Sequence, residues 1–271
     1  MNTFSKTGIT YDKERLLQRF ARFGFASIGI VYCLMGVLTV LAALGLSAEK
    51  GDKTEAFKVV YEQPFGKILL IAIALGMAGY VMLRIFQAFF DTENKGSDAK
   101  GIATRLNYLS SAIIYGSLIV YATKLAMGNP GSGNKREFFV SKIMSYPMGE
   151  WIVGIAGLVI IGVGIYQIYL GVSRKFMKHV QLYRANFHDA FEKAGMIGYA
   201  ARGLVFSIIG YFLVRAAVDS NPSEANGTRE AFDFLQHNFG NLLMGVVALG
   251  LIAYGVFMFV RARHENIRFS R

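Results

Sequence analysis

The chain has 271 residues, of which 54% are hydrophobic and only 17% are charged. These proportions exclude an ordinary soluble domain, in which about a quarter of the residues are charged. The net charge is +11, and the lone Cys33 excludes an intrachain disulfide and a cysteine metal cluster. The apolar residues fall into six blocks, which are residues 23–46, 65–90, 106–127, 149–172, 196–218 and 241–260.

Each apolar block is long enough to cross a membrane as a helix. A hydrocarbon core about 30 Å thick needs about 20 helical residues, and the loops between the blocks hold nearly all of the charge. A soluble helical bundle would show a polar face along each helix, and these blocks do not. We therefore predict an all-α integral membrane protein with six transmembrane helices, forming a single transmembrane domain over residues 1–271.

The first block predicts a retained helix rather than a cleaved signal peptide. Its apolar run covers residues 23–46, longer than the 7–15 residues usual for a signal core, and a long polar segment precedes it. Within this block we expect Cys33 to be a small packing residue rather than a reactive thiol.

The loops after the first, third and fifth blocks share a pattern. In each, a polar stretch leads into a segment that resembles an interfacial helix, and the next apolar block follows. The three segments are Thr54–Gln63, Lys135–Tyr146 and Thr228–Asn238. The blocks therefore group into pairs, each pair being one outward and one returning helix.

The basic residues predict the orientation of the chain. The two termini and the loops near residues 95 and 180 together hold 17 Lys and Arg, whereas the loops on the other side hold 8. An excess of Lys and Arg marks the cytoplasmic side. We therefore expect both termini in the cytoplasm, with this basic surface against anionic lipid headgroups. The net charge then needs no nucleic-acid partner.

Internal repeats predict the architecture. An offset of 174 carries Phe65-Gly66 onto Phe239-Gly240, and an offset of 83 carries Pro64-x-Gly66 onto Pro147-x-Gly149. One offset serves both helices of a unit, so the loop lengths are kept too. Parallel repeats are related by an axis along the membrane normal. We predict a pseudo-threefold bundle of three parallel two-helix repeats, at about residues 15–91, 99–176 and 190–264.

Small residues four positions apart recur in the first helix of each repeat. Such pairs let helix backbones approach closely in lipid, where packing replaces the hydrophobic driving force. We expect helix packing at the matched pairs Gly29/Cys33, Ala112/Gly116 and Gly203/Ser207.

Three stretches carry a resemblance to a known family. The segment Gly198–Gly210, the stretch Gln63–Lys67 and Gly79-Tyr80 resemble the repeat signatures of a bacterial membrane family, domain of unknown function 1206. Repeat two departs from the pattern, with Asn107 and Ile119 where the other repeats have glycine. The resemblance implies three two-helix repeats and a location in the bacterial inner membrane. It implies no activity.

The sequence lacks the residues that several membrane functions require at membrane depth. No Asp or Glu lies inside an apolar block, although proton-coupled transporters and cation sites usually need a buried carboxylate. None of the four histidines falls at membrane depth, so a bilayer haem is not expected. The sequence has no nucleophile elbow and no phosphate-binding loop. We expect no catalytic residue, no metal site and no cofactor.

Four cationic residues lie inside the blocks, and they are Arg84, Lys124, Arg202 and Arg215. Lys124 and Arg215 fall near the outer helix ends, where we expect them to snorkel to headgroups. Arg84 and Arg202 fall in the cytoplasmic third and match the polar residues Gln167 and Ser111 of repeat two. Two interpretations stay open for them: snorkelling to phosphates, or a shared cationic pocket. Arg suits such a pocket because its planar guanidinium pairs with carboxylate or phosphate.

The aromatic residues also allow two interpretations. Tyr32, Tyr115 and Phe206 occupy one matched position, and Tyr80 and Tyr254 another. We favour a packing layer around the axis over an aromatic cofactor box, since Tyr commonly fills helix interfaces.

The leading functional hypothesis is a non-enzymatic membrane protein that binds or conducts a small anionic or amphipathic species, such as an anion, a lipid or a quinone-like molecule. Its predicted ligand-binding residues are Arg84, Arg202, Gln167 and Ser111. The alternative is a structural or accessory subunit with a solid core and no ligand. A membrane-embedded enzyme or redox carrier is third. Membrane lipids are the expected partners, and a protein partner or a homo-oligomer stays open.

Overall fold

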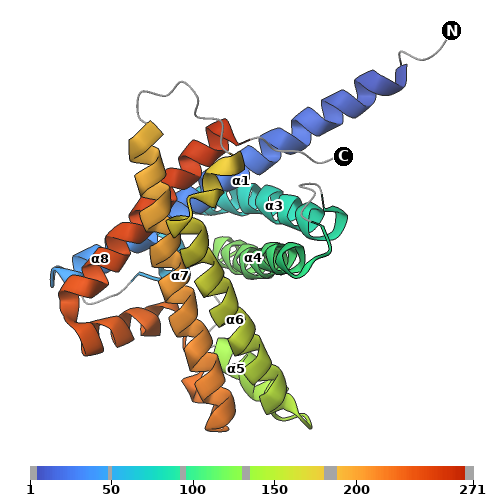
Figure 1. Cartoon of the computed structure of the whole chain (residues 1–271). Helices are drawn as coiled ribbons and strands as arrows, with labels where there is room; N and C mark the ends of the chain where they lie inside the picture. Colours follow the sequence, from blue (N-terminus) through green and yellow to red (C-terminus); the bar gives the residue numbers. More distant parts are fainter. Residues whose placement is uncertain (1–4, 48–50, 92–95, 130–134, 180–187, 266–271) are drawn as a thin grey trace.

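The computed structural model describes residues 5–47, 51–91, 96–129, 135–179 and 188–265. These residues form eight α-helices and two short 3-10 helices, with no strand among them (Figure 1). Six helices are long and apolar enough to cross a membrane, which confirms the predicted class. In chain order the elements are α1 Ser5–Ala43, α2 Lys53–Tyr61, α3 Gly66–Phe90, α4 Ala99–Ala126, α5 Lys135–Met144, α6 Gly149–Val172, η1 Lys175–His179, α7 His188–Val218, η2 Pro222–Glu224 and α8 Thr228–His264.

The long helices form three tandem pairs, namely α1 with α3, α4 with α6, and α7 with α8. A short helix precedes the second long helix in the first two repeats, at α2 and α5. In the third repeat, α8 contains both parts, and Gly240 with φ 82° interrupts its helical backbone between them. Phe65 and Met148, at φ 62° and 63°, make the bends before α3 and α6, one repeat position earlier than Gly240. All three predicted interfacial segments are therefore helical.

The long helices form a partial ring whose order follows the repeats, and the described chain leaves it open between α4 and α6. The second long helix of each repeat packs on the first of the next, so that α3 lies on α4, α6 on α7, and α8 on α1. We call the end where α1, α4 and α7 begin the terminal face. The opposite end, which carries α2, α5 and η2, is the loop face.

Small residues set the contacts between repeats. A Cβ on Gly29 of α1 would lie 2.8 Å from the carbonyl oxygen of Gly255 on α8, and one on Gly203 of α7 would lie 2.5 Å from that of Gly164 on α6. Gly255 and Gly164 are themselves equivalent under the repeat offsets. The same backbone-to-backbone approach therefore recurs in two interfaces of the ring.

The second members of these two pairs, Cys33 and Ser207, are half-buried and also lie against the facing helices. A Cβ on Gly255 of α8 would lie 2.5 Å from the Cys33 sulfur. Ser207 likewise reaches α6, because a Cβ on Gly164 would overlap its hydroxyl. That hydroxyl donates a hydrogen bond of 2.9 Å to the Gly203 carbonyl oxygen of its own helix. The bond satisfies Ser207 within α7, so the hydroxyl needs no hydrogen-bond partner on α6.

The third equivalent contact is different, and the packing prediction is wrong at Gly116. Ala112 is buried at 5% exposure, but a Cβ on Gly116 would meet nothing within 4 Å. The facing helix α3 has Val81 at the position of Gly164 and Gly255. This interface therefore lacks the second glycine that the other two have at their closest approach.

The two long helices of repeat two, α4 and α6, are also less closely packed than those of the other repeats. In repeats one and three, Gly24 and Gly198 sit against the backbone of Tyr80 and Tyr254, where a Cβ would come within 2.6 Å. Repeat two has Asn107 at the glycine position, and α4 and α6 pack less closely than the other neighbouring helices. Their described link is a hydrogen-bonding contact of 3.1 Å between the hydroxyls of Thr104 and Tyr166.

Candidate functional site

The four predicted ligand-binding residues all lie inside the bundle. Arg202 on α7 is 4% exposed and Arg84 on α3 is 6% exposed, while Ser111 on α4 and Gln167 on α6 are 4% and 1% exposed. Snorkelling to headgroups therefore does not describe either arginine. The structure brings the two arginines among aromatic rings but leaves the two polar residues in separate surroundings.

Arg202 points into the centre of the bundle. Its guanidinium lies 5.6 Å from the ring centre of Tyr32, 4.9 Å from Phe206 and 5.0 Å from Tyr254. Its Nη1 donates a hydrogen bond of 2.6 Å to the Tyr254 hydroxyl. Its Nε and Nη2 are buried and have no hydrogen-bond partner among the described residues. Three N–H donors of a permanent cation are thus directed into the interior.

Arg84 occupies a similar aromatic setting nearer the terminal face. Its guanidinium lies 4.7 Å from the ring centre of Tyr80 and 4.8 Å from that of Tyr108 on the neighbouring helix α4. Its Nη1 donates a hydrogen bond of 2.7 Å to the Gln87 side chain, while its buried Nε has no partner within the part of the chain that the structure describes. Arg84 therefore bridges repeats one and two.

The two polar residues of repeat two behave differently from each other. The Ser111 hydroxyl donates to the backbone carbonyl of Asn107 at 2.8 Å, a bond within its own helix. Gln167 has both amide atoms buried without a partner among the described residues. A buried amide in this state costs about 1–3 kcal/mol. Gln167 is therefore a second unmet polar group in the core, whereas Ser111 is satisfied.

An ion pair at the terminal face was not predicted. Arg261 on α8 is 6% exposed and Glu265 is 4% exposed, and Arg261 donates to that carboxylate through Nε at 2.6 Å and also through Nη2. Its Nη1 contacts the Tyr199 hydroxyl at 3.3 Å. The sequence alone assigns Arg261 to a cytoplasmic tail because the apolar run ends before it. The repeat offset of 174 could have pointed to this ion pair, because it aligns Glu265 with Asp91, another acidic residue at the end of a repeat.

Aromatic side chains fill the space between these cations. The hydroxyls of Tyr115 and Tyr32 lie 3.3 Å apart. Tyr80 packs edge-on against Tyr115, and Tyr254 against Tyr32, with ring centres 5.1 and 4.7 Å apart. The matched aromatic positions do form packing layers, and these layers also line the arginines with ring faces and hydroxyl groups.

The comparisons with known proteins fit this architecture. A family profile matches residues 23–91, 106–174 and 197–265, one match for each two-helix repeat. The chain belongs to this family, described as Domain of Unknown Function (DUF1206). It is similar to "Uncharacterized protein YxxB" of Bacillus subtilis (strain 168), with 30% identity over 266 residues, covering 97% of this chain and 96% of the relative. No solved structure matches the chain.

The three DUF1206 repeats each contribute to the buried polar groups. The first match contains Arg84, the second contains Gln167, and the third contains Arg202, Arg261 and Glu265. The interior cations are therefore part of the repeat framework rather than of a linker or a tail.

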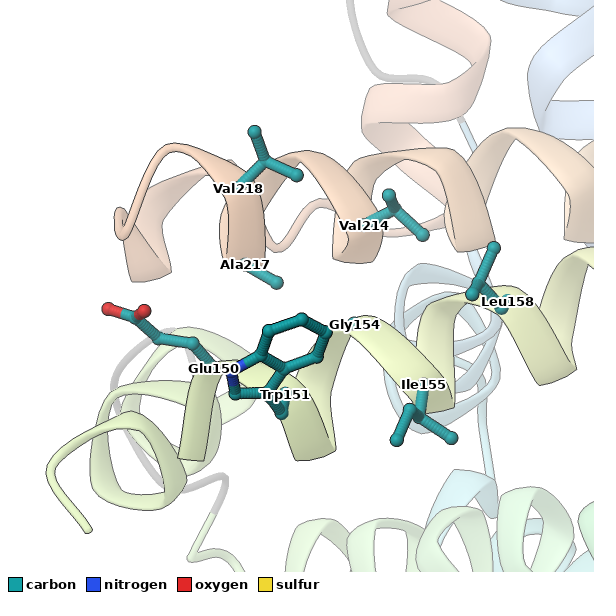
Figure 2. Close-up of a pocket in the computed structure, with 8 residues that line it drawn as sticks. All are labelled: Glu150, Trp151, Gly154, Ile155, Leu158, Val214, Ala217 and Val218. Atoms are coloured by element: carbon teal, nitrogen blue, oxygen red, sulfur yellow. The ribbon is translucent and has the colours of Figure 1, made fainter. Parts of the chain in front are cut away.

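The loop face of this DUF1206 protein also has an apolar groove between α6 and α7. Its volume is about 310 Å³, and Figure 2 shows Trp151, Val214 and Leu158 along its walls. Among the described residues that line it, Glu150 alone is charged. Trp151 is 72% exposed, as is usual at a membrane–water boundary. The groove suits a hydrocarbon chain rather than a charged group, so the interior is the stronger candidate site.

Arg215 lies on the same helix as Arg202, but its guanidinium has carboxylate partners. Its side chain is 47% exposed and lies 3.2 Å from Asp219 and 3.5 Å from Glu224. Arg202 and Arg215 point about 140° apart on a helix that turns 100° per residue, and they differ in burial and in partners accordingly.

Proposed function

We propose that this DUF1206 protein binds a small anionic group inside its helical bundle, either as a free anion or as the headgroup of an amphipathic molecule. Arg202 is the principal ligand-binding residue in this proposal. The role is one of binding or transport rather than catalysis.

The observation that carries this proposal is the hydrogen-bonding state of Arg202. The residue is 4% exposed, yet its Nε and Nη2 have no hydrogen-bond partner among the described residues. Burying an ion in protein costs several kcal/mol even after relaxation. A desolvated cation–π contact returns about 2 kcal/mol, and the ring faces leave the N–H groups unsatisfied. An oxyanion would satisfy charge and donors together.

A second candidate is a structural or accessory subunit with a solid core. The glycine-mediated contacts of α1 with α8 and of α6 with α7 favour it, as does the enclosure of Arg84 between the rings of Tyr80 and Tyr108. This candidate gives no account of why Arg202 and Gln167 keep unmet polar atoms in the core. We therefore rank it second.

We further propose that the terminal face lies in the cytoplasm, in the inner membrane of a bacterium. The supporting observation is the distribution of basic residues, with 17 on the terminal side and 8 on the other. Anionic lipids of the cytoplasmic leaflet are then the partners of that surface.

The decisive experiment is lipidomics and native mass spectrometry of the purified protein, comparing Arg202→Gln with Arg215→Gln. We expect the wild-type protein to retain an anionic molecule through delipidation. Arg202→Gln should lose most of it, because the charge that pairs with the ligand is gone.

Arg215→Gln is the matched control, since it removes the same charge from an exposed position on the same helix. It should retain the ligand as the wild type does. Equal retention by both variants, or no retained anionic molecule in the wild type, would leave the solid-core subunit as the better account.

A further inference from the structure

The first residue of α2, Lys53, reaches the axis of the bundle. Its Nζ lies 5.2 Å from the ring centres of Tyr32 and Tyr115 and 5.7 Å from that of Phe206. These three rings are equivalent under the offsets of 83 and 174, one from each repeat. A group at nearly equal distance from all three lies close to the pseudo-threefold axis. The sequence alone places Lys53 among the loop residues.

The backbone before α2 is held at this depth by specific contacts. Gly51 is buried, and a Cβ on it would overlap the carbonyl oxygen of Met35. The Thr39 hydroxyl lies 3.2 Å from the Gly51 carbonyl oxygen. Met35 and Thr39 are four to eight residues before Ala43, the last residue of α1, which is about 6–12 Å along a helix. The start of α2 therefore lies between the helices of the bundle, with the Lys53 side chain half-buried there.

Buried contacts along the rest of α2 hold the helix in this position. Ala56 and Phe57 are both 0% exposed, and the ring of Phe57 stacks on Tyr121 of α4. The side chain of Asp52 accepts a hydrogen bond from the Glu55 backbone amide. Asp52 thus caps α2 as well as lying beside Lys53 in sequence.

Lys53 and Arg202 face the same rings. Lys53 contacts the ring of Tyr32 at 5.2 Å, and Arg202 contacts it at 5.6 Å. Both also contact the ring of Phe206, at 5.7 and 4.9 Å. The interior therefore gathers two cations and the hydroxyls of Tyr32 and Tyr115. Two positive charges beside hydroxyl groups form the donor set that a carboxylate, sulfate or phosphate group binds.

We propose that Lys53 and Arg202 together bind one oxyanion, with α2 as the cap of the site on the loop face. This rests on the proposed function and adds a second binding residue to it. The ligand is either a free inorganic or organic oxyanion or the oxyanion of a lipid headgroup, since both present the same chemistry to the two cations.

Lys53 makes this site sensitive to pH. Burial lowers the pKa of the Lys53 ammonium, and the positive charge of Arg202 lowers it further, while Tyr32 and Asp52 act in the opposite direction. The titratable or charged groups near it are thus Tyr32 on α1, Tyr115 on α4, Arg202 on α7 and Asp52. Only the protonated amine attracts an anion, so affinity falls as the pH rises through this lowered pKa. An arginine in the place of Lys53 would keep its charge over this range.

The test measures how sulfate raises the melting temperature of the detergent-purified protein from mildly acidic to alkaline pH, because the charge of sulfate is constant over this range. A second arm replaces sulfate with an anionic phospholipid in mixed micelles. The variants are Lys53→Gln, Lys53→Arg, Arg202→Gln and the control Lys58→Gln, whose side chain is 51% exposed on the same helix.

We expect Lys53→Gln to weaken the apparent affinity about tenfold at mildly acidic pH, the loss of one charged hydrogen-bonding partner, and Lys58→Gln to leave it unchanged. Lys53→Arg should keep the affinity at mildly acidic pH and retain more of it at alkaline pH than the wild type, which a purely structural role of Lys53 would not produce. Stabilisation by sulfate identifies a free anion as sufficient, whereas stabilisation by the phospholipid alone identifies the headgroup.

If Lys53→Gln binds as the wild type while Arg202→Gln does not, the role of Lys53 is overturned and the proposed function stands. If neither sulfate nor phospholipid stabilises the wild type, both proposals fail.

Discussion

At the scale of single residues, one added methyl group is enough to test the repeat contacts. A Cβ on Gly198 would lie 2.6 Å from the backbone nitrogen and Cα of Tyr254, atoms that cannot rotate away. We expect Gly198→Ala to lower the free energy of unfolding by about 1–3 kcal/mol, as overpacking does. Thermal unfolding in detergent measures it as a lower melting temperature.

Gly116→Ala is the matched control, because a Cβ there would meet nothing within 4 Å. Alanine favours a helix over glycine by about 1 kcal/mol, so this variant should melt at or above the wild-type temperature. If both variants lose stability equally, backbone approach between α7 and α8 does not explain the glycine at position 198.

The interior residues were predictable to different degrees. Arg84 and Arg202 stand out because charge inside an apolar block is costly. Glu265 could have been found through its alignment with Asp91 under the repeat offset. Lys53 could not, because its depth depends on the contact of Gly51 with Met35 of α1. Sequence offsets align residues but do not place a loop.

At the scale of helices, the departures of repeat two have structural consequences. Asn107 replaces the glycine that lets the paired helices meet in the other repeats, and α4 and α6 pack less closely. In the most apolar windows of α4 and α6, 39% and 28% of the residues are buried, against 50–56% in the other long helices. The departure was visible in the sequence, but its effect depends on which helix faces Asn107.

We therefore expect α4 to open more readily than its equivalents. Local opening is easiest where few side chains are buried. In detergent, amide hydrogens of residues 104–122 should exchange several-fold faster than those of the equivalent residues 21–39 in α1 and 195–213 in α7. Mass spectrometry of peptic fragments measures this rate. Equal protection of the three segments would show that the weaker packing of α4 does not lower its stability.

At the scale of the whole molecule, a threefold framework holds an asymmetric interior. At each of three equivalent positions, one repeat has an arginine and the others do not. These positions are Ile28/Ser111/Arg202, Arg84/Gln167/Met258 and Gln87/Leu170/Arg261. Three identical sites would crowd like charges around one axis, whereas single arginines at different depths spread them along it. The repeated helices form the bundle, and the residues that differ between repeats form the candidate binding site.

The orientation of this asymmetric interior in the membrane is the last prediction. The bias of 17 to 8 basic residues predicts a cytoplasmic terminal face, so that Lys53 and α2 lie toward the outside. Cys33 is the only cysteine, so a Cys33→Ala background allows single cysteines at two exposed positions, Ser97 on the terminal face and Ser223 on the loop face. A membrane-impermeant maleimide should label Ser223→Cys in intact cells and Ser97→Cys only after lysis. Labelling of Ser97→Cys from outside would reverse the topology and place the proposed cap of the site toward the cytoplasm.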